Sequence, residues 1–378
     1  MLILTFAMVF ILVVSIFAAV NLLYEEHSKP EFFVGVEMAY SNATFADVKD
    51  LVDKVKDYTN LVVIGSPEIS KNQTLLNMTC DYIVDAGLNF VVLFTDTQMY
   101  SVDNSPKDWI PRATQKYGER FLAVYRYDEP GGGVLDHAHD SLIDETVVGR
   151  SANYSYASKL YVEYLYAHLS YYLVPSPSVL TADYGLFWFD YKSGYGTVLA
   201  ELGSNHSREI NVALCRGAGL ARNRDWGTII TWKYNKTPYV ESPDELYQDL
   251  VLSFRAGAKY AVVFDYPKVG RYGILNQTHL DKLSDFWSYV QSNPGDYGVD
   301  SAEVAYVLPA DYGFGFRSAD DHVWLWNADN LSQLASDDAK KLVSQYGSRF
   351  DIVYDDSETF GAVAARYGKL FFWNETIP

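Results

Sequence analysis

The sequence predicts an α/β protein built on a closed (β/α)8 barrel of the TIM type. Between residues 32 and 293, eight short apolar segments recur, and nearly all of them are followed by a stretch with helical spacing of apolar residues. The apolar segments are continuous rather than alternating, which is typical of parallel strands covered by helices. A doubly wound open sheet is the alternative, because the pattern does not show whether the sheet closes.

The expected elements follow one another in regular order. Asn42 or Thr44 can cap the first helix, and a later helix begins with Pro243 at its first position. Residues 131–151 are expected as a long polar loop, and the connection between the fifth and sixth strands is too short for a helix. The strands are expected at residues 32–36, 61–64, 90–94, 121–124, 179–182, 197–200, 228–231 and 261–264. The helices are expected around residues 45–55, 75–83, 109–117, 154–172, 207–221, 243 onward, and 280–290.

The first 23 residues differ from the rest of the chain. Residues 1–23 carry no charged side chain, and residues 2–20 are long enough to span a bilayer. A cleaved signal peptide is the competing interpretation. The segment lacks a basic start and its apolar run exceeds the usual length, although Ala18-Ala19-Val20 leaves room for cleavage. We therefore expect a membrane anchor or signal-anchor helix, followed by a polar tether over residues 24–31.

Glycosylation signals are unusually frequent. The chain has 17 asparagines, for which chance would give roughly two Asn-x-Ser/Thr sequons. The excess indicates an exported, N-glycosylated protein at the extracellular face of the cell membrane, secreted if the N-terminal segment is cleaved. The sequons are at Asn42, Asn72, Asn77, Asn153, Asn205, Asn235, Asn276, Asn330 and Asn374.

From residue 301 the alternation of strand and helix starts again. Strands are expected at residues 304–309, 350–354 and 369–373, with a helix over residues 332–346. This β-α-β-α-β set resembles half of a flavodoxin-like domain, so residues 301–378 are expected as a small, partial domain of that kind. Cys80 and Cys215 lie in helix-like stretches and are expected as separate buried thiols.

Composition and motifs exclude several classes of function. The formal net charge of −18 argues against nucleic acid, because phosphate binding needs clustered lysine and arginine. Residues 136–140 supply four potential metal ligands, but neighbours in a flexible loop are expected to be solvated, and no metal site is predicted. Residues 131–133 lack the Lys-Ser/Thr of a phosphate loop, and residues 313–315 lack the third glycine of a dinucleotide fingerprint. No cofactor is expected, and a homo-oligomer is left open.

The fourth strand ends on two adjacent carboxylates. Asp128 and Glu129 precede Pro130, which cannot donate to a ladder, and three glycines that let the backbone turn. Charge at the carboxyl end of a buried parallel strand is where α/β enzymes keep their chemistry. The plain alternative is that the two acids cap a loop.

A closed barrel brings several acids and aromatic residues to one mouth. Glycoside cleavage requires one carboxyl group that protonates the leaving oxygen and another that attacks the anomeric carbon or activates water. Alternatively, these acids pair with Arg126 and Lys233 or cap helices. The candidate catalytic residues are Glu129, Glu201, Glu37 and Asp128. The candidate substrate-binding residues are Arg126, Tyr127, Asp96, Tyr184, Trp188, Trp232, Lys233, Asp265 and Tyr266.

Asp128-Glu129-Pro130 resembles the Asn-Glu-Pro signature of a large clan of retaining barrel glycosidases, in which the glutamate is the acid/base. A barrel followed by a flavodoxin-like domain is similar to the architecture of β-galactosidases with a trimerisation domain. That clan has its nucleophile on strand seven, where this chain has residues 232–234, Trp-Lys-Tyr. Other barrel glycosidases resemble a strand-four plus strand-six arrangement, which implies Glu201 as the partner of Glu129, with Glu37 in reserve.

Two functions follow from these patterns. The first is a membrane-anchored glycoside hydrolase acting on polysaccharide or glycan. The second is a catalytically inactive carbohydrate-binding or cell-surface coat glycoprotein on a barrel scaffold. The absence of an acid at strand seven favours the second, and the concentration of acids and aromatic residues favours the first. A second carboxylate about 5 to 9.5 Å from Glu129 is the geometric requirement of the hydrolase.

Overall fold

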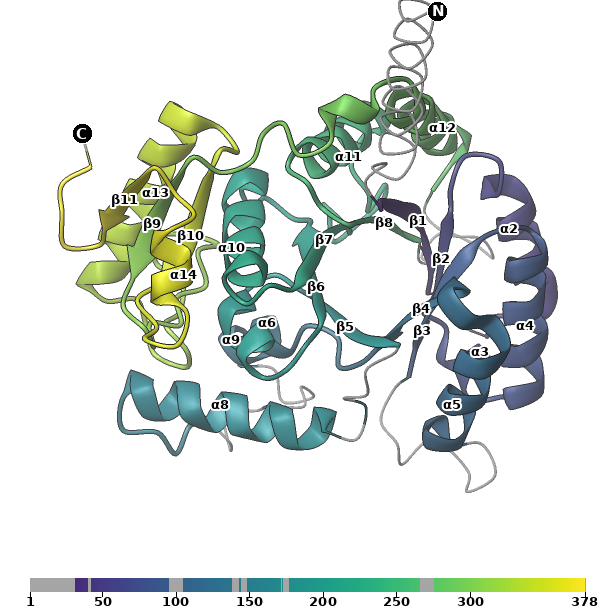
Figure 1. Ribbon diagram of the computed structural model, residues 1–378, viewed down its shortest axis with the longest axis horizontal. Coiled ribbons are helices and arrows are strands. Elements are labelled where there is room, and N and C mark those ends of the chain that lie inside the picture. Colours follow the sequence, from purple (N-terminus) through teal and green to yellow (C-terminus); the bar gives the residue numbers. More distant parts are fainter. Residues whose placement is uncertain are drawn as a thin grey trace, which may run out of the picture.

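The structure is a computed structural model that describes residues 31–39, 42–94, 105–137, 143, 148–170, 172, 177–265 and 275–377. Eight parallel strands form a closed barrel in which each strand pairs with the next, and β8 pairs with β1 (Figure 1). The predicted closed barrel is confirmed, and the open-sheet alternative is wrong. The strands are β1 (Phe33–Met38), β2 (Leu61–Ile64), β3 (Asn89–Leu93), β4 (Phe121–Tyr125), β5 (Ser178–Asp183), β6 (Thr197–Leu202), β7 (Asp225–Ile230) and β8 (Tyr260–Asp265).

Helices surround the ring of strands (Figure 1). Their starts follow local sequence signals: Thr44 forms a capping box with Asp47, and Ser242 forms another with Glu245 behind Pro243. The helices of the barrel are α2 (Phe45–Val55), α3 (Pro67–Ser70), α4 (Gln73–Asp85), α5 (Pro106–Tyr117), α6 (Pro130–Leu135), α8 (Tyr154–Leu169), α9 (Phe187–Lys192), α10 (Arg208–Ala221), α11 (Pro243–Arg255) and α12 (Gln277–Ser292).

Two connections differ from the sequence prediction. The link between β5 and β6 contains α9, so the expectation of a helix-free link is wrong. Six residues suffice because Phe187 and Phe189 are almost fully buried, which stabilises a helix too short to persist alone. The stretch after β4 begins with α6 rather than with a polar loop. The residues of that stretch from 138 to 147, except Ile143, lie outside the described part of the chain.

The barrel has two hydrophobic cores, which alternate along each strand. One core fills the barrel interior and includes Phe33 of β1 and Leu199 of β6, whereas residues such as Val34 and Val198 pack outward against helices. Successive side chains of a strand point to opposite faces. Residues an even number of positions beyond Phe33 and Leu199 therefore face the interior, and this rule decides which acids reach the mouth.

The C-terminal unit is a three-stranded parallel sheet with the order β10-β9-β11. It packs beside α10 of the barrel (Figure 1), where an added Cβ at Gly217 would lie 2.6 Å from the carbonyl oxygen of Ile352. The three predicted strands are present, while the likeness to a flavodoxin-like domain stays a prediction. The elements are β9 (Val304–Leu308), α13 (Asn330–Tyr346), β10 (Phe350–Tyr354), α14 (Phe360–Ala364) and β11 (Lys369–Phe372).

A buried ion pair joins this unit to the barrel. Arg216 of α10 donates from Nε to Asp351 at 2.7 Å and from Nη2 to the carbonyl oxygens of Ser348 and Phe350. Both charged side chains are almost completely buried. The guanidinium of Arg216 thus donates several hydrogen bonds to the C-terminal unit at once, which its rigid planar arrangement of N–H groups allows.

Two predictions concern the ends of the chain and its cysteines. The anchor over residues 1–23 and tether residues 24–30 lie outside the described residues. Within the described ranges, no helix has the length and apolar character needed to cross a membrane. Cys80 and Cys215 are both buried and unpaired, so the prediction of separate buried thiols is confirmed.

Candidate active site

The chain leaves β4 through a bulge that orients Glu129. The backbone N–H of Arg126 donates to the carbonyl oxygen of Leu180, and the backbone N–H of Glu129 donates to the carbonyl oxygen of Ala182. The segment after β4 therefore advances three residues where β5 advances two, which is the extra residue of a bulge. Tyr127 and Glu129 have φ values of 56° and 49°, in the left-handed region that non-glycine residues seldom occupy. Backbone strain of this kind persists only where the surrounding structure enforces it, and it clusters at functional sites.

The glycines after Pro130 allow α6 to approach β5 closely. The backbone N–H groups of Gly131 and Gly132 donate to the carboxylate of Asp183 at 2.6 and 2.8 Å. An added Cβ at Gly132 would lie 2.1 Å from the ring of Tyr184, and one at Gly131 would lie 2.5 Å from the carbonyl oxygen of Gly185. The sequence suggested that these glycines let the backbone turn. In the structure, Gly131 and Gly132 are instead needed for close packing in the first turn of α6.

We expect Gly132→Ala to lower the free energy of unfolding by about 1–3 kcal/mol, because the new methyl group must displace the Tyr184 ring. The measurement is urea unfolding followed by tryptophan fluorescence. Gly361→Ala is the matched control, since an added Cβ at Gly361 meets nothing within 4 Å. Equal stability of the two variants would contradict the packing role of Gly132.

Strand alternation separates the acids at the carboxyl ends of the barrel strands into two groups. Glu37 lies four residues beyond Phe33, and Glu201 lies two residues beyond Leu199, so both face the barrel interior. Asp183 and Asp265 have the opposite parity and face outward. Asp183 binds the start of α6, and Asp265 accepts a hydrogen bond from the backbone N–H of Leu275 at 3.1 Å.

Four carboxyl groups meet at the mouth: Glu37, Asp128, Glu129 and Glu201. Burial and the nearby Asp128 raise the pKa of Glu129 to about 7. Burial, followed by repulsion from Glu129 and Asp128, holds the pKa of Glu201 well above its usual range. Burial and the charge of Asp128 also raise the pKa of Glu37 well above its usual range. The hydroxyl of Tyr125 donates to Asp128. Carboxyl groups so close together cannot all ionise.

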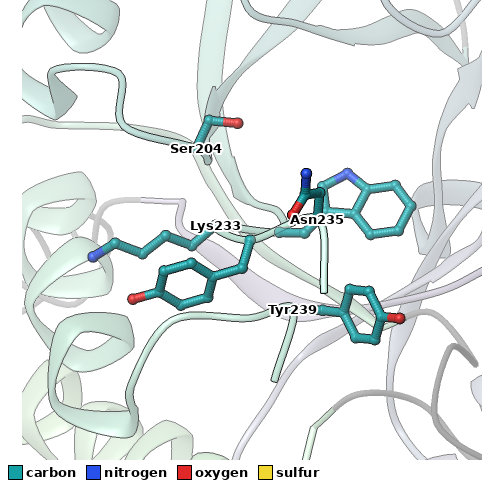
Figure 2. A pocket seen from close by; sticks show the side chains of 6 residues that line it. Ser204, Lys233, Asn235 and Tyr239 are labelled. Carbon is teal, nitrogen blue, oxygen red and sulfur yellow. The ribbon is translucent and has the colours of Figure 1, made fainter. Parts of the chain in front are cut away.

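Glu129 and Glu201 line one cavity of about 260 Å³. A second cavity, of about 340 Å³, is shown in Figure 2. It adjoins the first, because Ser204 and Trp232 line both. The other residues of the first cavity are Asp136, Tyr184, Gly203, His206, Thr231 and Arg317. The other residues of the second cavity are Lys233, Tyr234, Asn235 and Tyr239. The predicted residues Tyr184 and Trp232 thus lie with the acid pair.

The C-terminal unit supplies one wall of this site. Arg317 lies between β9 and α13, and its Nε and Nη2 donate to Asp321 at 2.9 and 2.7 Å. Its Nη1 pairs with Asp136, which also accepts from the hydroxyl of Tyr184 at 2.7 Å. Sequence reasoning missed Arg317, and no local signal connects it with the barrel mouth. Thr231 and His206 were missed as well, although both follow barrel strands by only a few residues.

Three predicted substrate-binding residues are turned away from the acid pair. Arg126 is buried on the outer face of the barrel wall, between the strands and the surrounding elements. Its guanidinium donates to the carbonyl oxygen of Phe94 and lies 4.2 Å from the ring centre of Tyr127. Tyr127 packs edge-on against His168. Lys233 lines the second cavity, but its Nζ pairs with Glu245 at 2.5 Å, and Figure 2 shows it extending away from Tyr239.

Trp188 does not line the mouth as predicted. It is fully buried in α9, its Nε1 donates to Asp356 at 3.4 Å, and its ring centre lies 5.1 Å from that of Tyr354 in β10. The residue therefore joins the barrel to the C-terminal unit instead of lining the mouth. The predicted residues Asp96 and Tyr266 lie outside the described part of the chain.

The acidic groups do not form a metal centre in the part of the chain that the structure describes. No group of three or more histidine, cysteine, aspartate or glutamate side chains there is arranged to hold an ion. Of the loop that carries potential ligands, only Asp136 and His137 are described. Asp136 pairs with Arg317, and His137 stacks edge-on with His322.

We expect the protein to lose stability as the pH rises from 5 to 8. Glu129 and Asp183 have pKa values of about 7, and Glu241 has one of about 8, all raised by burial above the values of an unfolded chain. The folded state therefore binds more protons than the unfolded state in this window, and the free energy of unfolding falls with increasing pH. Urea midpoints at unit intervals of pH measure the slope. Glu129→Gln should flatten it, and a midpoint that rises toward pH 8 would contradict the assignment.

Comparison with known proteins places the fold but no family. No family model and no curated protein sequence matches the chain. Among solved structures, α-L-fucosidase isoenzyme 2 from Paenibacillus thiaminolyticus matches with a TM-score of 0.53 and 10% identity, over 90% of this chain and 64% of that chain. The present chain thus spans less than two thirds of that enzyme. At this identity, the likeness shows a shared fold alone.

Other neighbours have different activities. The pneumococcal virulence factor StrH, described for N-glycan recognition and hydrolysis, matches with a TM-score of 0.46 and 10% identity, over 70% of this chain and 85% of that chain. A D-psicose 3-epimerase matches with a TM-score of 0.41 and 10% identity, over 70% of this chain and all of that chain. The structural neighbours therefore include both glycoside hydrolases on TIM barrels and sugar epimerases.

Proposed function

We propose that this protein is a glycoside hydrolase in which Glu129 is the general acid/base and Glu201 is the nucleophile. One observation carries the proposal: the carboxyl groups of Glu129 and Glu201 line the same cavity at the barrel mouth. Neighbouring carboxyl groups cannot both ionise, so the pair holds one protonated and one ionised member, and the proposed roles require the proton to lie on Glu129 when substrate is bound.

The closeness of the pair supports retention of anomeric configuration. Retaining enzymes hold their two carboxyl groups about 5–5.5 Å apart, whereas inverting enzymes hold them about 6.5–9.5 Å apart so that water fits between. Glu129 and Glu201 line the same cavity of about 260 Å³, and Glu129 raises the pKa of Glu201, so we assign the shorter separation to this pair. Bond cleavage then proceeds through attack of Glu201 on the anomeric carbon while the leaving oxygen takes the proton of Glu129. Water later releases the sugar, with Glu129 accepting its proton.

The rest of the cavity suits a sugar. Hydroxyl and charged groups of Tyr184, Asp136 and Arg317 surround the acid pair, and Trp232 offers an aromatic face at the passage to the second cavity. Sites of this kind combine an apolar wall with a few convergent polar groups. Glu37 and Asp128 take no direct part in the reaction; the charge of Asp128 raises the pKa of Glu129, which helps to keep Glu129 protonated.

The decisive experiment is hydrolysis of a panel of polysaccharides and N-glycans, followed by reducing-end assay. The proposal expects turnover by the native protein and none by the double variant Glu129→Gln/Glu201→Gln. Binding of a panel member by the native protein without any turnover would instead support a carbohydrate-binding or surface-coat protein. Glycan affinity electrophoresis on the same panel separates the two results.

We also propose that the protein is an N-glycosylated protein held at the extracellular face of the cell membrane by residues 1–23. The proposal is supported by the exposure of all nine sequon asparagines, whereas Asn60, Asn89 and Asn211 are partly or fully buried and belong to no sequon. Peptide-N-glycosidase treatment in heavy-oxygen water, followed by mass spectrometry, should convert most of the nine asparagines to labelled aspartate. Unlabelled asparagine at all nine sites would overturn the proposal.

A further inference from the structure

The nine sequons share one position in the topology. Each lies in a connection that leaves the carboxyl end of a strand, or in the first half of the helix that such a connection enters. Asn42, Asn205 and Asn235 lie in the loops after β1, β6 and β7. Asn72, Asn153 and Asn276 are the N-caps of α4, α8 and α12, while Asn77 and Asn330 lie early in α4 and α13, and Asn374 follows β11.

Helix capping alone does not explain this distribution. Asparagine is a favoured N-cap, and helices of an α/β barrel begin near the mouth, so some asparagines gather there for structural reasons. Three of the nine are such caps, and the other six are not. Asparagine also occurs at the opposite pole, where Asn223 and Asn293 are exposed, yet neither has serine or threonine two residues later. The sequon, rather than the asparagine, is absent from that pole.

The described chain begins at the sequon-free pole. Glu31 lies two residues before β1, and its carboxylate lies 2.9 Å from Nζ of Lys259, which directly precedes β8. Lys259 also pairs with Asp225 at the start of β7, again at 2.9 Å. The entry point of the chain is thus held against the ends of the barrel where the strands begin.

The tether between this entry point and residue 23 is short. Residues 24–30 span at most about 25 Å when fully extended. A globular domain of roughly 350 residues has a radius of gyration of about 20 Å, so a path around the domain from one pole to the other is much longer than the tether. An anchor over residues 1–23 would therefore hold the strand-start pole, and not the mouth, next to the bilayer.

We propose that the pole of the barrel where the strands begin lies against the membrane surface, with the Glu129–Glu201 mouth facing away behind a ring of glycans. The inference rests on the proposed membrane anchoring and is independent of the proposed catalysis. The glycan at Asn235 borders the second cavity, and Asn205 belongs to the neighbouring loop. The substrate therefore comes from outside the cell surface rather than from the lipid headgroups beneath the protein.

Energy transfer from single-cysteine variants to acceptor lipids tests this orientation. The full chain, made in a glycosylating host, is reconstituted in phosphatidylcholine vesicles and isolated by flotation. Cys80 and Cys215 are buried, so maleimide dyes react at the introduced cysteine. Asp57→Cys and Glu119→Cys place the dye at exposed positions just before β2 and β4, whereas Glu68→Cys and Lys236→Cys place it at exposed positions after β2 and β7. None of the four residues is in the proposed catalytic pair.

We expect at least twofold higher transfer efficiency from positions 57 and 119 than from positions 68 and 236. If the protein floats but transfer is more efficient from positions 68 and 236, or equally efficient from all four positions, the proposed orientation is overturned and the anchor is not. Failure of the protein to float would overturn the anchor and the orientation together. Hydrolysis of the glycan panel by the same preparation is unaffected by any of these results, so the catalytic proposal is judged separately.

Discussion

We expect Glu129→Gln to lower kcat by about 10²- to 10⁴-fold on substrates whose leaving group is an ordinary sugar alcohol, because such a leaving oxygen needs the proton that Glu129 supplies. The loss should be much smaller on an aryl glycoside whose phenol leaves without protonation. Glu201→Gln should abolish turnover of both substrates, because the nucleophile is required whatever the leaving group. Steady-state kcat and KM on the paired substrates measure the difference.

The pH profile adds a second readout. With a pKa of about 7, Glu129 loses its proton above neutrality, so the native kcat/KM should fall on the alkaline side. Glu129→Gln removes that limb. Glu68→Gln is the matched control, an exposed glutamate in α3 after β2 whose carboxylate accepts from Ser66 at 3.0 Å. An equal loss of kcat on both classes of substrate would remove the assigned role of Glu129. Activity on the aryl glycoside that is retained by Glu201→Gln and lost by Glu129→Gln would reverse the two roles.

The second large effect is expected at the junction of barrel and C-terminal unit. Asp351→Ala leaves the guanidinium of Arg216 buried without its counter-charge and should lower the free energy of unfolding by about 3–5 kcal/mol. The variant also removes the hydrogen bond that Tyr367 donates to Asp351 at 2.7 Å. Urea unfolding at pH 7 measures the loss, and limited proteolysis shows whether the C-terminal unit separates first.

A matched pair on the surface provides the control for that measurement. Lys159 and Glu163 lie one turn apart on α8 at 3.8 Å, and both side chains are more than half exposed. Glu163→Ala should change the free energy of unfolding by less than about 1 kcal/mol. A change for Asp351→Ala as small as that for Glu163→Ala would contradict the account of the junction. Because the same unit carries Arg317 to the mouth, a separated unit should also raise KM.

The fold was readable from the sequence because its strands are buried on both faces. β2 lies at the predicted residues 61–64, since a run of four apolar residues there is bounded by polar ones. β7 begins three residues before its prediction, because Asp225 and Gly227 interrupt the apolar pattern. The short helix α9 was missed because its stability comes from the buried Phe187 and Phe189 contacting other parts of the chain, which local spacing does not reveal.

The site was readable only in part. Position at a strand end suggested Glu129 and Glu201, and strand parity would have separated them from Asp183 and Asp265, which face outward. Arg126 was misjudged for a related reason: it follows Tyr125, an interior residue, and so lies on the outer face. Arg317 was out of reach, because its place depends on how the C-terminal unit packs on the barrel.

The most direct test of the paired carboxyl groups is to trap the glycosyl-enzyme intermediate. The native protein is incubated with a panel of 2-fluoro glycosides that carry activated leaving groups, which form the covalent intermediate and slow its release. Peptide mass spectrometry then locates the sugar. The account predicts a single labelled peptide with the sugar on Glu201, and a Glu201→Gln variant that stays unlabelled. A sugar attached to Glu37 or Asp128, or turnover of natural substrate with inverted configuration, would contradict it.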